Sequence, residues 1–158
     1  MKTLKIWIIG PPGSGKSTLA RKLEFEKSIL KYDLDSIRWK EGWEMEEVDK
    51  FISKTDEITK QDSWIIDGYY PVLKKFLNRA DLIICLKTQL FISLLRIYKR
   101  TKYRIDNKVL VCNNNKESWE FFLSKEGLLR YTIKEHYNYK KYYIPNLLDE
   151  GLDIKIKS

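Results

Sequence analysis

One short motif near the start of the chain restricts the fold more than any other feature of the sequence. Residues 10–17 read GPPGSGKS, which satisfies the pattern G-x-x-x-x-G-K-[ST]. The β-branched and aromatic run at 5–9 predicts a buried strand before it, and a helix is predicted at 16–26. Glycines let the backbone curl around phosphate oxygens, and a helix N-terminus adds its dipole. The alternative, a glycine-rich turn without a ligand, is disfavoured because strand and helix stand where phosphate binding needs them.

Each part of this loop has a predicted task. Lys16 reaches the outer phosphates, and the Ser17 hydroxyl binds a magnesium ion that accompanies them. We therefore expect a nucleoside triphosphate as the ligand, most simply ATP with Mg²⁺. The residues predicted to bind it are Gly10, Pro11, Pro12, Gly13, Ser14, Gly15, Lys16, Ser17 and Thr18.

Beyond the loop, strand patterns alternate with helix patterns. Such alternation is typical of a parallel sheet with helices on both faces, so the predicted class is α/β with five strands. We expect a single domain over residues 1–158, because this length suffices for one hydrophobic core. The further predicted strands are 29–34, 64–67, 82–86 and 152–157. The further predicted helices are 46–60, 71–79, 90–103 and 117–143, the last with a break at Gly127 and a stop at Pro145.

The composition favours a soluble protein without a membrane span. Hydrophobic residues make up 43% of the chain and charged residues 33%, and the longest apolar runs fall far short of the roughly 20 residues of a spanning helix. The N-terminus leads straight into a strand without the pattern of a signal peptide, so we expect a cytoplasmic location. Cys85 and Cys112 lack a metal-ligand spacing, and His136 lacks a neighbouring carboxylate pattern, so packing or surface roles are expected for them.

The net charge of +8 comes from one region. Residues 87–141 contain thirteen Lys or Arg and five Asp or Glu, whereas the remainder of the chain is balanced. A basic surface attracts polyanions, which include nucleic acid as well as a triphosphate with a phosphorylated acceptor. The tyrosines between 131 and 143 favour packing over base stacking, because they recur at helical spacing. Charge alone does not separate the two kinds of partner.

Three carboxylates follow two of the predicted strands, at the edge where ligands collect in open α/β sheets. Asp33 and Asp35 stand two residues apart and point the same way if the strand continues through them. Alternatively, Asp35 or Ser36 begins a helical turn as its cap. Asp67 closes the strand 64–67 and is placed to hold a magnesium-bound water, with a plain Asp-Gly turn as the alternative.

Basic residues line one side of the predicted helix that follows the fourth strand. Arg96, Lys99, Arg100 and Arg104 recur at spacings of three and four, which stacks them along the helix. Phosphoryl transfer depends on positioning and on stabilising charge, and arginines on such a helix supply both. The alternative is a solvated basic face, which applies most to Lys99 and Arg104.

Taken together, three stretches resemble the P-loop small-molecule kinases related to adenylate kinase, and most closely the topology-modulation or FlaR-like proteins. Those proteins share a phosphate loop, an L-D-x-I-x-W-K-x-G-W stretch and a W-I-I-D-G segment, which here are residues 10–18, 34–43 and 64–68. The resemblance covers most of the chain. It implies a fold of the nucleoside-monophosphate-kinase type, with an acceptor site after the second strand. It also implies a mobile helical lid, inserted around residues 96–120, that carries Arg96 and Arg100.

The resemblance also implies roles for the carboxylates. In shikimate-kinase-like enzymes one of two paired aspartates faces magnesium and the other faces the acceptor hydroxyl. By this likeness Asp33 binds the metal and Asp35 the acceptor. The Asp-Gly that begins at Asp67 resembles that of adenylate kinases, but the arginine that follows it there is absent here, which argues against AMP as the acceptor.

These observations predict an ATP-dependent kinase of a small acceptor, which is a nucleotide, a nucleoside or a hydroxy compound. The predicted catalytic residues are Lys16, Asp35, Arg96 and Arg100, and the predicted metal-binding residues are Ser17, Asp33 and Asp67. The alternative function is a nucleotide-dependent regulator that binds nucleic acid through the basic region. A regulator needs no acceptor carboxylate, so Asp35 distinguishes the two functions.

Overall fold

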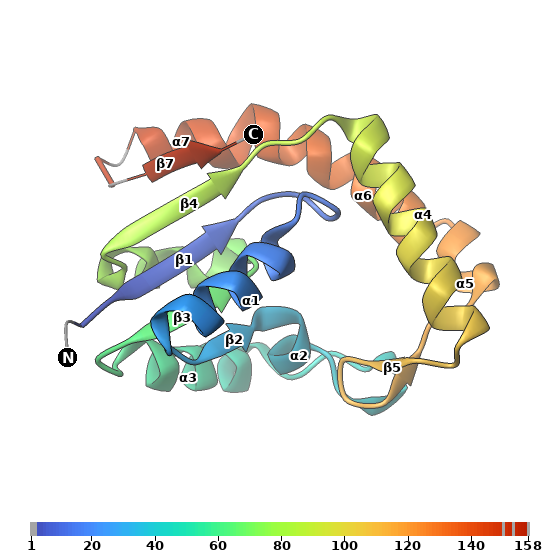
Figure 1. The fold of residues 1–158 in the computed structure, drawn as a ribbon, viewed down its shortest axis with the longest axis horizontal. Coiled ribbons are helices and arrows are strands. Elements are labelled where there is room, and N and C mark those ends of the chain that lie inside the picture. The colour runs from blue at the N-terminus through green and yellow to red at the C-terminus, as the bar shows by residue number, and fades with distance from the viewer. Residues whose placement is uncertain (1–2, 150, 153, 158) are drawn as a thin grey trace.

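The computed structural model describes residues 3–149, 151–152 and 154–157 of the chain (Figure 1). Its main sheet has five parallel strands in the order β2-β3-β1-β4-β7, which confirms the predicted α/β class. The strands are β1 (Lys5–Ile9), β2 (Lys31–Asp33), β3 (Trp64–Asp67), β4 (Leu82–Leu86) and β7 (Ile154–Lys157). β7 lies within the predicted strand 152–157, of which residue 153 falls outside the described residues. Within the described ranges, no helix combines the length and apolar character needed to cross a membrane.

Helices cover both faces of the sheet, as the alternation of side chains along β1 requires. Ile6 and Ile8 belong to the core cluster on one face, where they pack with Ala20 of the first helix. Trp7 and Ile9 belong to the cluster on the other face. The covering helices are α1 (Lys16–Lys27) on the first face, and α3 (Val48–Thr59), the 3-10 helix η2 (Pro71–Arg79) and α7 (Ile144–Leu148) on the second. Because β1 is buried on both faces, it fixes the position at which the following loop begins.

The second strand ends earlier than the sequence predicts. β2 stops at Asp33, and the chain turns at once into the short helix α2 (Leu34–Arg38), which a 3-10 turn η1 (Glu41–Trp43) follows. Asp33 caps α2, because its carboxylate accepts a hydrogen bond from the backbone N–H of Asp35 at 2.9 Å. The strand does not continue through Asp35, and the alternative of a helical turn is confirmed, since this capping bond favours a helix over a strand. The cap is also Asp33 and not Asp35 or Ser36.

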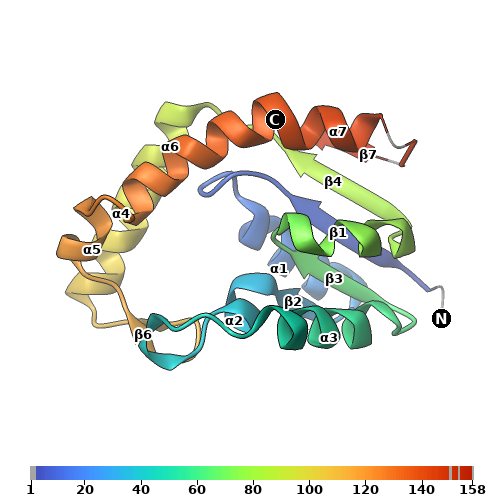
Figure 2. The ribbon, with the colours of Figure 1, turned by 180° about the vertical axis from the view of Figure 1, so that it is seen from behind.

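The chain after β4 forms an arc that leaves the sheet, passes beside α2 and returns (Figures 1 and 2). Its elements are α4 (Leu90–Asp106), the antiparallel hairpin of β5 (Leu110–Val111) and β6 (Asn115–Lys116), α5 (Trp119–Leu123), α6 (Leu128–Asn138) and the π-helical turn η3 (Tyr139–Tyr143). The sequence predicts the helix 90–103 but no strand where the hairpin lies. Strands of two residues are too short to show a period in the sequence.

The break predicted at Gly127 is confirmed, and the stop predicted at Pro145 is wrong. A Cβ atom at Gly127 would overlap the carbonyl oxygen of Phe121, so only glycine fits between α5 and α6. Beyond α6 the helix continues through η3 directly into α7. Pro145 stands in the first turn of α7. The wider π-turn before Pro145 changes the hydrogen-bond pattern, so the proline, which has no backbone N–H, does not interrupt the helix.

Candidate active site

The loop between β1 and α1 forms the cradle that the sequence motif predicts. Gly13 and Gly15 have positive φ angles of 76° and 96°, a conformation that glycine adopts without strain. A hydrogen bond from the Ser14 N–H to the Pro11 carbonyl, at 3.2 Å, closes the turn. α1 begins directly after the loop without a side-chain cap. The N–H groups of its first turn are therefore open to an anion.

Neighbouring elements set the shape of this loop. A Cβ atom at Gly10 would stand 2.9 Å from the Leu86 carbonyl oxygen, and one at Gly13 would stand 2.7 Å from the Ser93 carbonyl oxygen. Leu86 ends β4 and Ser93 lies in the first turn of α4. The phosphate loop is thus packed against the end of a central strand and the start of α4.

Lys16 is the cation at the centre of the site. Its ammonium group donates a hydrogen bond to the Pro11 carbonyl oxygen at 3.1 Å. Burial lowers the pKa of Lys16, and the carboxylates of Asp67 and then Asp35 act in the opposite direction. Groups from α1, β3 and α2 are therefore close enough to interact through their charges. A phosphate oxygen would offer the ammonium group a stronger partner than this carbonyl, because the bond would join opposite charges.

Asp67 has the character of a metal-binding carboxylate. It ends β3 and is 2% exposed, and its Oδ2 atom has no hydrogen-bond partner among the described residues. Burial raises the pKa of Asp67, against the opposing effects of Lys16 and the Ser17 hydroxyl. A buried carboxylate oxygen needs a partner, so Asp67 and Ser17 fit Mg²⁺.

The described residues contain no cluster of three or more Asp, Glu, His or Cys arranged to hold a metal on their own. This agrees with the usual coordination of Mg²⁺, which is bound by one or two carboxylates together with phosphate oxygens.

Asp33 and Asp35 lie together, but not as a pair along a strand. The Asp33 carboxylate accepts hydrogen bonds from the Asp35 N–H at 2.9 Å and the Ser36 hydroxyl at 3.4 Å. Burial raises the pKa of Asp33, and the charges of Asp35 and Asp67 act in the same direction. Asp35 is exposed in the first turn of α2, and its Oδ1 atom accepts a hydrogen bond from the Tyr70 hydroxyl at 2.7 Å. Asp33 thus serves as a cap near Asp67, while Asp35 is open to a ligand.

α4 brings the two predicted arginines to the site. The Nη1 atom of Arg96 donates to a carbonyl oxygen of the phosphate loop at 3.2 Å. Burial lowers the pKa of Arg100, one turn further along, and Asp35 is among the groups that raise it. Although nearby atoms enclose part of the guanidinium group, Arg100 remains accessible to solvent and keeps its full charge, as arginine does in proteins. Arg104, by contrast, is held by Glu117 at 2.6 Å.

Three contacts at the site have no counterpart in the sequence predictions. Tyr70 orients Asp35, and its only sequence signal is its position after the Asp-Gly of β3. His136, for which a packing or surface role is predicted, lies with Nε2 2.8 Å from the Ser93 hydroxyl, behind the phosphate loop. Asn113 and Asn115 donate to backbone carbonyl groups in α2 and just after it. The partners of these residues lie far away in the chain, so no local pattern points to them.

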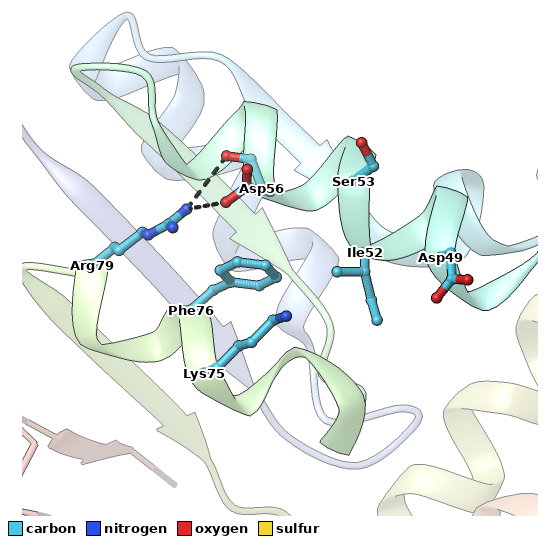
Figure 3. A pocket seen from close by; sticks show the side chains of 7 residues that line it. All are labelled: Asp49, Ile52, Ser53, Asp56, Lys75, Phe76 and Arg79. Atoms are coloured by element: carbon cyan, nitrogen blue, oxygen red, sulfur yellow. Dashed lines mark hydrogen bonds and ion pairs between the residues drawn. The ribbon is translucent and has the colours of Figure 1, made fainter.

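A separate hollow of about 490 Å³ lies between α3 and η2 and is lined by none of the predicted site residues (Figure 3). Arg79 donates there to the Asp56 carboxylate at 2.8 Å and to the Thr59 hydroxyl at 2.7 Å. Its guanidinium group also lies 4.8 Å from the ring centre of Phe76. These contacts of Arg79 join η2 to α3.

The order of the parallel strands, with a phosphate loop after β1 and helices on both faces, defines the class. It is the α/β fold of the P-loop kinases. Within that class, the chain is similar to shikimate kinase from Acinetobacter baumannii in complex with shikimate, with 19% identity, a TM-score of 0.60, and coverage of 99% of this chain and 85% of that chain.

Similar values relate it to two other kinases. For deoxyadenosine kinase from M. mycoides the identity is 14%, the TM-score 0.58 and the coverage 98% and 90%. For a gluconokinase from Sinorhizobium meliloti 1021 they are 11%, 0.56, and 98% and 82%. No protein-family model and no curated protein sequence matches the chain. At these identities the likeness shows the fold, and the reaction must be inferred from the site.

Proposed function

We propose that this protein is an ATP-dependent kinase that transfers the γ-phosphoryl group to a small acceptor, which is a nucleotide, a nucleoside or a hydroxy compound. The observation that carries the proposal is the position of Asp35. Its carboxylate is exposed and oriented by the Tyr70 hydroxyl. It also lies near enough to Lys16 to oppose the lowering of the lysine pKa by burial. A carboxylate at this place can accept a proton from a hydroxyl group beside the terminal phosphate.

In the proposed reaction the acceptor oxygen attacks the γ-phosphorus while its proton passes to Asp35. The bond between the γ-phosphorus and the bridging oxygen of ADP breaks, and ADP leaves with the electron pair of that bond. Lys16 and the loop N–H groups hold the phosphates in line, in the nucleotide site formed by residues 10–18. Arg96 and Arg100 stabilise the charge that develops on the transferring group.

The proposal assigns magnesium to Ser17, Asp33 and Asp67. The support is the buried, unpartnered oxygen of Asp67, with the Ser17 hydroxyl and the capping carboxylate of Asp33 close by. When bound, Mg²⁺ neutralises part of the triphosphate charge. The remaining task of these side chains is to keep the phosphates in one orientation relative to Asp35.

We further infer that residues 96–120 act as a lid within a single domain, as the resemblance to adenylate-kinase-related and topology-modulation proteins implies. The inference is supported by the position of this stretch, which begins with Arg96 and Arg100 and reaches α2 and the residue after it. Closing such a lid excludes water, which would otherwise compete as the acceptor. The use of ATP also fits a cytoplasmic location.

The alternative function, a regulator that binds nucleic acid, has less support from the basic region. Lys102 is paired with Asp106 at 2.6 Å. The Lys141 ammonium group covers the rings of Tyr137 and Tyr142, at 5.2 and 5.3 Å from their centres. Those ring faces are the ones on which bases would stack. DNA affinity that persists at physiological salt would favour the alternative, because non-specific phosphate contacts weaken steeply with salt.

An acceptor screen tests the proposal. Purified protein is incubated with Mg-ATP and a panel that contains shikimate, deoxyadenosine, gluconate, nucleoside monophosphates and other hydroxy compounds. ADP release and the mass of the products are measured, with Lys16→Ala as the control for contaminating kinases. We expect a phosphorylated product from one class of compound with the wild type and none with the variant. No product from any compound, or equal product from the variant, would contradict the proposed function.

A further inference from the structure

The turn of the β5–β6 hairpin and the first residue of β6 are joined to the segment after β2 by hydrogen bonds between residues 74 to 77 positions apart. The side-chain amide of Asn113 donates to the carbonyl oxygens of Ser36 at 2.8 Å and Trp39 at 2.6 Å. The side-chain amide of Asn115 donates to the Lys40 carbonyl at 2.8 Å. The hairpin accordingly lies beside the segment after β2 in both ribbon views (Figures 1 and 2).

Asn115 and Trp43 form the centre of this contact. Asn115 is 3% exposed, and its Oδ1 atom accepts a hydrogen bond from the Trp43 backbone N–H at 2.7 Å. The Trp43 indole donates to the Lys116 carbonyl at 3.0 Å, and its ring stacks on Phe121 with centres 6.2 Å apart. Most of these bonds end on backbone groups, so they fix one register between the hairpin and the segment after β2.

Within this contact, Asn113 acts on the helix that carries Asp35. Ser36 follows Asp35 directly, and the Trp39 N–H donates to the Asp35 carbonyl at 2.9 Å. A helix of five residues has little stability of its own, so its direction depends on the contacts at its ends. Asp33 caps the first end of α2, and Asn113 holds two carbonyl groups toward its other end.

The hairpin is in turn tied to α4. It follows α4 in the chain, and the Arg104–Glu117 ion pair at 2.6 Å connects the last turns of α4 to the residue after β6. We propose that Asn113 is a positioning residue: by binding α2 to the hairpin, it holds Asp35 of α2 in place relative to Arg100 of α4. This inference rests on the kinase function proposed above. It adds a residue that touches neither nucleotide nor acceptor.

The chain offers a matched pair of variants for a test. Asn113 and Asn114 are both exposed and have φ angles of 65° and 67°, and the described part of the chain shows no side-chain hydrogen bond for Asn114. Glycine adopts this backbone readily, so Asn113→Gly and Asn114→Gly remove a side chain without adding strain. Asn113→Asp keeps the size but replaces the donor by an acceptor. Asn115 is less suitable, because its loss would leave buried groups unpaired.

Two measurements report on the proposed role. Hydrogen exchange of the Asp35 and Trp39 amides reports on α2, and steady-state kinetics with the compound phosphorylated in the screen report on transfer. In Asn113→Gly and Asn113→Asp, both amide hydrogens should exchange faster than in the wild type. The kcat of both variants should fall roughly ten- to hundredfold, because Asp35 is no longer held in place. The Kd of Mg-ATP should stay within about twofold, because the phosphate loop is untouched. Asn114→Gly should match the wild type.

A double variant separates positioning from general damage. In an Asp35→Asn background, Asn113→Gly should cause no further loss of kcat, because the group that it positions no longer acts. An equal loss in that background would overturn the proposal. Wild-type exchange and kcat in Asn113→Asp would also overturn it, since a donor would then be unnecessary.

Failure of the kinase function would appear separately. A wild-type protein that phosphorylates none of the compounds would remove the catalytic purpose of Asn113. The exchange rates would still decide whether Asn113 fastens α2, and unchanged rates in both Asn113 variants would overturn that part as well.

Discussion

Among the residues of the phosphate loop, Gly13 has the least freedom to change. Its φ angle is 76°, and a Cβ atom would stand 2.7 Å from the Ser93 carbonyl oxygen. Gly13→Ala should therefore lower the free energy of unfolding by roughly 1–3 kcal/mol. The displaced loop should bind Mg-ATP roughly tenfold or more weakly. Urea unfolding and nucleotide titration measure the two effects.

Gly151→Ala is the matched control for this prediction. Gly151 has a similar φ angle of 68° but open space around it, so alanine there adds strain without a clash. Equal effects of the two substitutions on stability and on nucleotide affinity would contradict the role of crowding at Gly13.

Asp67 combines a predicted function with a cost in stability. Its pKa is raised by burial, so in the folded protein it binds a proton at a higher pH than in the unfolded chain. Stability therefore falls as the pH rises through this raised pKa. Asp67→Asn should raise the free energy of unfolding of the ligand-free protein at about pH 7 by roughly 0.5–2 kcal/mol while removing Mg²⁺-dependent turnover. The gain should shrink as the pH falls toward the ordinary carboxyl value of about 4.

Urea unfolding of wild type and variant across this pH range tests the prediction for Asp67. A variant that is less stable than the wild type at neutral pH would show that the carboxylate has a partner that offsets its burial.

Among the elements, α2 is short and depends on its cap. Asparagine caps a helix about as well as aspartate and carries no charge to be buried, so Asp33→Asn should not lower the free energy of unfolding at neutral pH. Asp33→Ala, which has no cap, should be less stable than Asp33→Asn by about 1 kcal/mol. Since Asp33 is also predicted to face Mg²⁺, both variants should need more Mg²⁺ for nucleotide binding. Calorimetric titration at several Mg²⁺ concentrations measures this. A wild-type Mg²⁺ dependence in Asp33→Asn would leave Asp33 with the capping role alone.

α4 carries the prediction for the arginines. Arg96→Ala and Arg100→Ala should each lower kcat by roughly 10²–10³-fold, because a guanidinium group in this place acts on charge that develops during transfer. The Kd of Mg-ATP should change much less than kcat. Lys99→Ala, on the same exposed stretch of α4, is the control and should leave the kinetics unchanged. Wild-type kinetics in both arginine variants would show that these residues form a solvated basic face and take no part in transfer.

Local signals in the sequence suffice for the strands and the phosphate loop, and long-range contacts decide the rest. β1 and the helix start at Lys16 follow from neighbouring residues alone. The hairpin does not, because Asn113 and Asn115 find their partners more than 70 positions away. α2 has a local cap in Asp33, but its position against the hairpin depends on the same distant contacts. Pro145 is predicted to end a helix, since a π-turn before it leaves no mark in the sequence.

The same distinction holds for the candidate site. The lysine and glycines of the loop are fixed by their motif, and Asp67 follows from the end of its strand. Tyr70 reaches the site only when the segment after β3 meets α2, and His136 only when α6 meets α4. The sequence therefore predicts which chemical groups reach the site, and the fold determines how they are oriented.

In the whole molecule, three parts of the chain converge on one edge of the sheet. The phosphate loop after β1 supplies Lys16, α2 supplies Asp35, and the arc that begins with α4 supplies Arg96 and Arg100 (Figure 1). The hairpin contact closes this arc onto α2. Nucleotide and acceptor would thus be held between parts of the protein that are bonded to each other.

The kcat of Asp35→Asn for phosphoryl transfer from Mg-ATP to the identified acceptor tests the kinase function most directly. Asparagine keeps the size of the side chain and a hydrogen bond with Tyr70 but cannot accept the proton. We predict that kcat falls by roughly 10²–10⁴-fold, while the Kd of Mg-ATP stays within about twofold because the phosphate loop is unchanged. A variant that retains the wild-type kcat would contradict the proposed function.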